Sequence, residues 1–317
     1  MYKSFVLIKN LRSNSNELNF SEFRLTKIQQ YAGHDDLKKA QKLFSKGVPL
    51  YGDWVYERSY PDIVLDDLTD IIPNDVEDTL LLLRLFKVGD LVFTNHCITE
   101  QDEPMFRQLP YRVMADIRPF QKYELENEEC SEFDKFSSEM MSQNNWDSAW
   151  FQTARRFFLY GSSKYFNSIK NEVDRIVDYM IVMESILVTE NNFVGRRLRE
   201  RAASLLKNPD IYDNGIKSLL RDFYKVRSKI VHGDDISSFK DSIRDKQIIN
   251  KFESIVREII KEAIKSVPEG EENRKVFLKR LFDVCDGDRA TKVYQDFCAI
   301  KDATEKNRCF DSISKHL

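Results

Sequence analysis

One segment of the chain carries side chains whose types and spacing suit phosphodiester cleavage. Residues 219–233 run Leu-Leu-Arg-Asp-Phe-Tyr-Lys-Val-Arg-Ser-Lys-Ile-Val-His-Gly, which places Arg227 five residues before His232. Cleaving RNA internally requires a base for the 2′-hydroxyl proton, a cation for the developing phosphorane charge and an acid for the leaving oxygen. A histidine and an arginine supply all three without a metal ion, because arginine stays charged and grips phosphate through paired hydrogen bonds.

The predicted helix that carries these two residues limits how they act together. Gly233 follows His232 directly and is expected to end the helix. On a regular helix, residues five apart lie about 140° apart around the axis, so Arg227 and His232 of one chain do not converge on one phosphate. A distorted last turn or a partner chain must complete the site, and a closed two-fold dimer meets this need.

The same segment resembles a known family of helical domains. Arg-x4-6-His at a helix end is similar to the signature of HEPN domains, and Tyr-x-x-Arg-Ser-x-Ile-Val-His-Gly at residues 224–233 is similar to their Apea-like group. Residues 174–184 resemble the second helix of the family with its acidic positions, and residues 196–206 resemble its arginine-rich third helix. A weaker likeness extends to residues 80–89.

The resemblance implies a metal-independent RNA endonuclease that acts as a homodimer, leaves a 2′,3′-cyclic phosphate and serves as a toxin or an antiphage-defence effector. It implies Arg227 and His232 as the catalytic residues and Glu184 as a partner that orients Arg227. Tyr224 is a supporting residue that either stacks on a base or closes the core. Ser228, also supporting, stands where many active relatives carry Asn, Asp or His. The alternative is a non-catalytic HEPN module that binds RNA or a nucleotide, or that only joins two chains.

Basic residues gather around this segment. The whole chain has a net charge of −3, so its surface has no general attraction for nucleic acid. Residues 196–231 hold ten Arg or Lys against four acids, a local net charge of +6 that is typical of a phosphate-backbone contact. Taken alone, such a run is more often a solvated helix face. The residues predicted to bind RNA are Arg196, Arg197, Arg199, Arg201, Lys225 and Lys229.

Other chemistries lack their motifs in this sequence. There is no glycine-rich nucleotide loop, no nucleophile elbow and no His-Glu-x-x-His, and the five cysteines form no Cys-x-x-Cys pair. We therefore expect neither a metal ion nor a cofactor. No apolar run reaches the roughly 18 residues of a membrane helix, and no secretory signal is present, so we expect a cytoplasmic protein without membrane contact.

The patterning of apolar residues predicts an α+β chain. In the first part, alternation predicts strands within residues 4–9, 18–26, 53–57 and 91–98. Helical spacing there predicts helices at residues 35–46 and 74–86, the second capped by Asn74 with Glu77 completing a capping box. Further helices are predicted at residues 133–141, 146–158, 164–187, 194–206, 214–231 and 243–266.

These elements divide the chain into three predicted parts. Residues 1–145 form an α+β domain, 146–266 an all-helical HEPN domain, and 267–317 a C-terminal helical extension. The first domain is expected to sense a trigger ligand or protein, or to restrain the nuclease. This regulatory role rests on the domain order alone.

Overall fold

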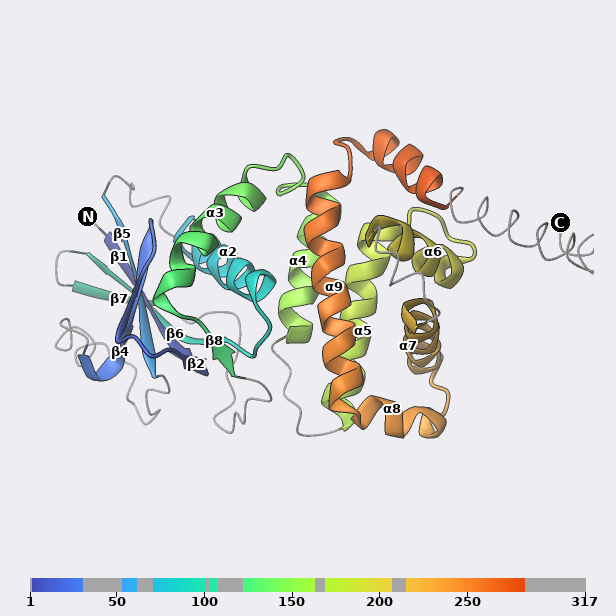
Figure 1. The fold of residues 1–317 in the computed structure, drawn as a ribbon, viewed down its shortest axis with the longest axis horizontal. Coiled ribbons are helices and arrows are strands. Elements are labelled where there is room, and N and C mark those ends of the chain that lie inside the picture. Colours follow the sequence, from blue (N-terminus) through green and yellow to red (C-terminus); the bar gives the residue numbers. More distant parts are fainter. Residues whose placement is uncertain are drawn as a thin grey trace, which may run out of the picture.

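The computed structural model describes residues 2–30, 53–61, 71–100, 103–107, 122–162, 169–206 and 215–282. A β-sheet lies at one end, a group of helices lies at the other, and α2 (Ile71–Phe86) and α3 (Cys130–Met141) lie between them (Figure 1). The predicted α+β class is therefore confirmed.

A six-stranded sheet with antiparallel pairings forms the N-terminal end. Its order is β3-β4-β5-β1-β6-β7, so β1 has a strand on each side. Within β1 the run Phe5–Ile8 is buried throughout, as a central strand covered on both faces requires. A separate parallel pair joins β2 to β8. The strands are β1 (Tyr2–Lys9), β2 (Leu11–Arg12), β3 (Glu17–Asn19), β4 (Phe23–Lys27), β5 (Trp54–Tyr60), β6 (Val92–Glu100), β7 (Glu103–Arg107) and β8 (Tyr123–Glu124).

Two local predictions for this part of the chain were wrong. Residues 18–26 form a hairpin rather than one strand, because the N–H of Phe20 bonds to the carbonyl of Phe23 at 3.0 Å and reverses the chain. Asn74 does not cap α2, which begins at Ile71. Pro73 is tolerated in the first turn, where its missing N–H has no partner to lose. The helix predicted at residues 35–46 lies outside the described residues.

The helices after residue 145 follow the predicted pattern closely. The predicted bounds 194–206 are those of α6, and 214–231 differs from α7 by one residue at each end. The predicted helix 243–266 is divided, because the Asp245 side chain accepts from the N–H groups of Gln247 and Ile248 and starts a new helix. The elements are α4 (Ala149–Ser162), α5 (Ile169–Leu187), α6 (Val194–Leu206), α7 (Gly215–His232), α8 (Lys240–Arg244), α9 (Lys246–Ser266) and the helical residues 271–282. The described residues also form short 3-10 turns, η1 (Ile28–Gln30), η3 (Asn127–Glu129) and η4 (Ser237–Phe239).

One apolar core runs through both ends of the molecule. It includes Trp54 of the sheet, Leu83 of α2, Phe158 of α4 and Phe252 of α9 in a single cluster of buried side chains. The helix α9 runs alongside α5 (Figure 1) and buries residues at helical spacing, which is the apolar stripe of an amphipathic helix. The sheet and the helical end are therefore packed against each other by ordinary hydrophobic burial.

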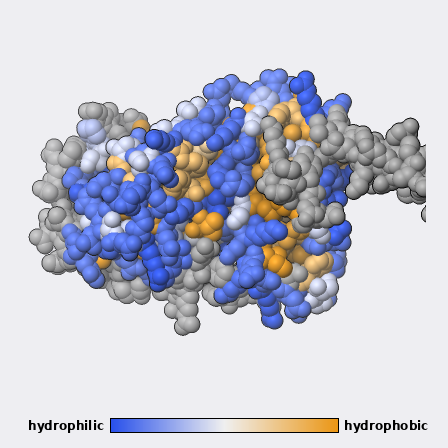
Figure 2. Space-filling model, in the orientation of Figure 1, coloured by the Kyte–Doolittle hydropathy of each residue, from blue (hydrophilic) through white to orange (hydrophobic). Residues whose placement is uncertain are grey.

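The outer surface shows no apolar belt on the face drawn in Figure 2. Hydrophilic residues cover most of this face, and the hydrophobic patches in its middle and over the helical end are separated by hydrophilic ones (Figure 2). Of the helices that the structure describes, none combines the length and the apolar character that crossing a bilayer demands.

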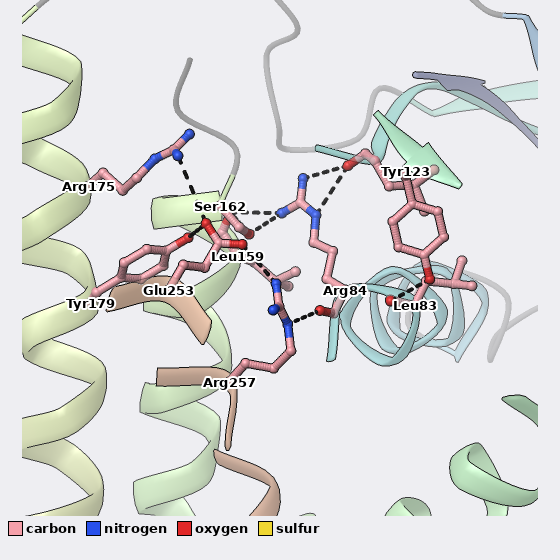
Figure 3. A network of polar contacts seen from close by, with 10 residues as sticks. Leu83, Arg84, Tyr123, Leu159, Ser162, Arg175, Tyr179, Glu253 and Arg257 are labelled. Carbon is pink, nitrogen blue, oxygen red and sulfur yellow. Dashed lines mark hydrogen bonds and ion pairs between the residues drawn. The ribbon is translucent and has the colours of Figure 1, made fainter. Parts of the chain in front are cut away.

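A buried arginine of α2 ties the sheet end to the helices (Figure 3). Arg84 donates from Nε and Nη2 to the carbonyl of Leu91 at 3.2 and 2.8 Å. Its Nη1 donates to the carbonyl of Leu159 in α4 at 3.2 Å and also to the Ser162 hydroxyl. The backbone carbonyl of Arg84 in turn accepts from Nε of Arg257 in α9 at 2.6 Å. One side chain thus satisfies the carbonyl of Leu91, just before β6, and that of Leu159, in the last turn of α4, which apolar packing would leave unpaired.

The second half of this network is built on Glu253 of α9. Its carboxylate accepts from Arg257 Nη2 at 2.9 Å and from the Tyr179 hydroxyl at 2.7 Å, and Arg175 Nη1 lies 3.9 Å away. All four side chains are buried. A buried charge is tolerated only when it is paired and hydrogen-bonded, which is the case here. The network therefore fixes α5 and α9 in one register.

Replacing Arg84 by methionine tests this junction. Arg84→Met keeps the apolar stem but leaves the buried carbonyls of Leu91 and Leu159 without donors, so we expect a loss of about 3–5 kcal/mol in the free energy of unfolding. Urea unfolding measures it, with the exposed Arg244→Met as the matched control. If both variants unfold at the same urea concentration as the native chain, the Arg84 network does not hold the two ends together.

A buried carboxyl near the network predicts a pH dependence. Glu172 is 2% exposed, and its carboxyl oxygens accept no hydrogen bond from the part of the chain that the structure describes. Burial raises its pKa to about 7; among the charged groups around it, Arg175 of α5 and Lys246 of α9 lower the pKa and Asp90 before β6 raises it. Because this pKa exceeds that of the unfolded chain, the folded state keeps a proton that the unfolded chain loses between its ordinary pKa and about 7.

Stability is therefore expected to fall as the pH rises through this range, by up to about 3 kcal/mol for this group. Glu172→Gln should remove most of the fall, as measured by urea unfolding at about pH 5 and about pH 8. The exposed Glu258→Gln serves as the control and should keep it. An unchanged pH slope in Glu172→Gln would show that this carboxyl is not the cause.

Candidate functional site

The end of α7 is built as the sequence predicts. Gly233 has a φ of +76°, its N–H donates to the carbonyl of Ile230 at 3.1 Å, and the N–H of Asp234 donates to Lys229 at 2.8 Å. This pair of bonds is a Schellman motif, whose left-handed residue favours glycine. The prediction that Gly233 ends the helix is confirmed. His232 is consequently the last helical residue, and it is exposed.

Arg227 forms an ion pair with an acidic residue of another helix. Its Nη2 lies 3.0 Å from Oε2 of Glu184 in α5, and both side chains are partly buried, at 24% and 21% exposure. The predicted contact between these two residues is thus confirmed. Burial raises the pKa of Glu184 above its ordinary value, although the charge and hydrogen bond of Arg227 lower it. The two side chains thus lie at hydrogen-bond distance in a partly desolvated setting, where such a contact positions a side chain firmly.

The Arg227–Glu184 pair also keeps unused hydrogen-bonding capacity. Nε of Arg227 and Oε1 of Glu184 are buried and have no hydrogen-bond partner within the described parts of the chain. A buried polar atom without a hydrogen-bond partner destabilises the folded state unless a water or a ligand bonds to it. The Arg227 side chain is also 24% exposed, so the exposed part of its guanidinium can contact an anion.

Tyr224 lies one helical turn before Arg227 and covers a glycine of α6. A Cβ on Gly195 would lie 2.7 Å from Cδ1 and Cε1 of the Tyr224 ring, so any larger residue there would push the ring away. Burial and the charge of Glu184 raise the pKa of the Tyr224 hydroxyl, while Arg227 lowers it. The ring therefore belongs to the same local surface as the Arg227–Glu184 pair and packs on the core as well. Gly195 was not foreseen; its place inside a predicted helix was the available signal.

The rest of the predicted segment lies on the outer side of α7. Ser228 is half-buried, and Val231 is 57% exposed next to the exposed His232. Because α7 is a continuous α-helix to His232, its last turn is not distorted. Arg227 faces α5. His232 follows five residues later, so it lies about 140° further around the helix axis. Within one chain the two residues therefore point in different directions.

The prediction that Arg201 binds RNA was wrong. Its side chain is 1% exposed and donates to Glu190 at 2.8 and 2.7 Å and to the carbonyl of Leu187 at 2.8 Å. The hydrogen bonds from Arg201 lower the pKa of Glu190 to about 2. Arg201 thus ties the end of α5 to α6 and has no surface to offer a phosphate.

Two arginines near Arg201 on α6 also form contacts within the chain. Arg197 lies 3.4 Å from Glu190, and the guanidiniums of Arg196, Arg197 and Arg201 lie 5.3, 5.9 and 6.0 Å from the ring centre of Phe282. These distances are those of cation–π contacts. Glu184 and Glu190 both precede the segment in which the local charge of +6 was counted, so that count overstates the free positive charge.

The other predicted basic residues remain nearer the surface. Lys225 is exposed, while Lys229 donates from Nζ to the carbonyl of Asp235 at 2.9 Å and so helps to close the end of α7. Arg199 is half-buried on α6. Burial lowers its pKa, and the charges of Arg221 and Arg196 lower it further while Glu200 raises it. Arg199 therefore lies near two like charges and one opposite charge, that of Glu200.

Neither a metal centre nor a known relative emerges for this chain. Among the described residues, no group of three His, Cys, Asp or Glu side chains is placed to hold a metal ion. Searches against protein-family models, curated proteins and solved structures found no match. The functional argument consequently rests on the residues and their geometry.

Proposed function

We propose that this protein is a metal-independent RNA endonuclease of the HEPN type that acts as a homodimer in the cytoplasm. The observation that carries the proposal is the Arg227–Glu184 ion pair, which fixes a partly exposed guanidinium on the same helix that ends in the exposed His232. These are the residue types that RNA cleavage without a metal requires.

Each residue has a defined role in this proposal. His232 takes the proton from a 2′-hydroxyl, whose oxygen attacks the adjacent phosphorus, and Arg227 stabilises the charge that develops on the phosphorane. The bond from phosphorus to the 5′ oxygen breaks, and an imidazolium returns a proton to that oxygen. The products are a 2′,3′-cyclic phosphate and a 5′-hydroxyl. Glu184 keeps Arg227 in place, and Tyr224 offers its ring to a base.

Two copies of the chain complete the proposed site. Arg227 and His232 point in different directions on one regular helix, so a second α7 must bring its own histidine or arginine to the phosphate. The exposed Val231 and His232 at the end of α7 suit a two-fold contact between copies. The sheet end of the molecule would then sense a trigger or restrain cleavage, in a toxin or a defence effector.

The second candidate is a non-catalytic HEPN module that binds RNA or a nucleotide, or that only joins two chains. Ser228 favours it, because many active relatives in the resembled family carry Asn, Asp or His there. The internal pairing of Arg197 and Arg201 with Glu190 favours it too, since less positive charge remains for RNA. Cleavage activity separates the two candidates.

Cleavage of mixed RNA in excess EDTA tests the proposal. The native protein is expected to leave 2′,3′-cyclic phosphate ends, and Arg227→Ala and His232→Ala should each lower the rate by about 100-fold or more, because each removes a charged or proton-transferring group. The control is Arg244→Ala on α8, which is exposed and lies outside the site.

Two results contradict the proposal. One is cleavage that EDTA abolishes, and the other is cleavage that survives in both variants while their melting curves match the native chain. If the full chain is folded and forms a dimer but cleaves no RNA, the non-catalytic module becomes the preferred function.

A further inference from the structure

We propose that Arg199 of α6 and Arg221 of α7 form a second phosphate-binding subsite, which holds the RNA strand beside the phosphate bound at Arg227. The inference deepens the proposed function and rests on it for the identity of the strand. It concerns a step of recognition that is separate from the chemistry at His232.

The register of the two helices brings these arginines together. Gly195 of α6 lies against Tyr224 of α7, and further along Glu200 pairs with Lys217. The second contact lies later in α6 but earlier in α7 than the first contact. The two helices therefore run antiparallel. Arg199 lies between the two contacts on α6, and Arg221 lies between them on α7. Their side chains consequently share one stretch of the helix–helix contact.

Arg221, Tyr224 and Arg227 also form a row on α7. They follow one another at intervals of three residues, and residues at this spacing are surface neighbours with Cβ atoms about 5–6 Å apart. The rise from Arg221 to Arg227 is about 9 Å along the axis. A cation thus lies at each end of the row with an aromatic ring between them. This is the arrangement in which phosphates bind at two points and a base contacts the ring between.

The charges around Arg199 point to an anion. Arg199 is half-buried and feels the like charges of Arg221 and Arg196, while Glu200, the acid beside it, is engaged by Lys217. Like charges held together are unfavourable unless an anion binds among them. Arg221 is half exposed, donating to Ser218 Oγ at 2.9 Å and lying 3.4 Å from Asp222, and an exposed ion pair of this kind contributes little.

A comparison with Arg201 on the same helix shows which arginine stabilises the fold and which is available to a ligand. Arg201 is buried and paired with Glu190, so it stabilises the fold. Arg199 is half-buried, and the acid that acts most strongly on it, Glu200, is itself paired with Lys217. Removing Arg199 should therefore cost little stability, whereas removing Arg201 should cost much.

Binding of a labelled single strand tests the subsite apart from catalysis. We would measure the fluorescence anisotropy of a 5′-fluorescein oligouridylate of about ten nucleotides in EDTA, with His232→Ala as the parent protein so that the strand stays intact. Adding Arg199→Ala and Arg221→Ala should weaken binding by about tenfold or more, because hydrogen bonds to a charged partner are lost. The slope of log affinity against log salt should fall by about 0.7 for each phosphate contact removed.

Matched variants make the result specific. Lys251→Ala with Arg244→Ala removes two exposed charges elsewhere and should bind like the parent, while Arg199→Lys with Arg221→Lys should keep most of the salt slope. The double alanine variant should also melt at the parent's temperature or above it. Unchanged affinity and slope in that variant overturn the subsite, as does an equal loss in the Lys251 and Arg244 control.

The two proposals fail separately. If the double alanine variant loses binding although the native protein cleaves no RNA, the subsite is supported and the nuclease proposal is contradicted. If the native protein cleaves RNA and the double alanine variant binds like its parent, the nuclease proposal is supported and the subsite is contradicted.

Discussion

Glu253 carries a negative charge inside the core, and the packing of the whole molecule has to accommodate it. A buried carboxylate is tolerated only with close partners, and Arg257 and Tyr179 supply them at 2.9 and 2.7 Å. Arg257 in turn donates to the carbonyl of Arg84, whose own guanidinium satisfies the carbonyls of Leu91 and Leu159. Each group in this series depends on the next for its hydrogen bonds. The sheet, α2, α4, α5 and α9 consequently have one mutual arrangement that satisfies all of them.

The helix α5 transmits this constraint to the candidate site. Its middle carries Arg175 and Tyr179, which belong to the buried network, and its C-terminal part carries Glu184, which holds Arg227. From Tyr179 to Glu184 a helix rises about 7.5 Å, and a packed helix transmits position over this length without loss. Arg227 is therefore aimed by a residue whose own place is set in the core. A site that recognises a phosphate benefits from this arrangement, because no reorganisation is needed when the charge develops.

Local signals in the sequence were sufficient for much of this fold and for the centre of the site. Apolar periodicity predicted α6 to the residue, Gly233 predicted the end of α7, and the family resemblance predicted the contact of Glu184 with Arg227. The failures had two causes: a contact that only the packing of helices creates, and a turn without the usual turn residues. Arg201 looked like a surface residue in a basic run, because its partner Glu190 and its burial follow from the packing of α6 on α5. The strand predicted at residues 18–26 failed because the turn at Phe20 carries no glycine or proline.

The link between the core and the chemistry is most directly tested by a double-mutant cycle on RNA cleavage in EDTA, with Glu184→Gln, Arg227→Ala and the two combined. If Glu184 acts only by holding Arg227, its substitution slows cleavage in the native background, and the double variant cleaves at the rate of Arg227→Ala alone. If the two effects multiply instead, Glu184 acts on the reaction by a route of its own. The account of a phosphate-binding arginine positioned by α5 is then contradicted.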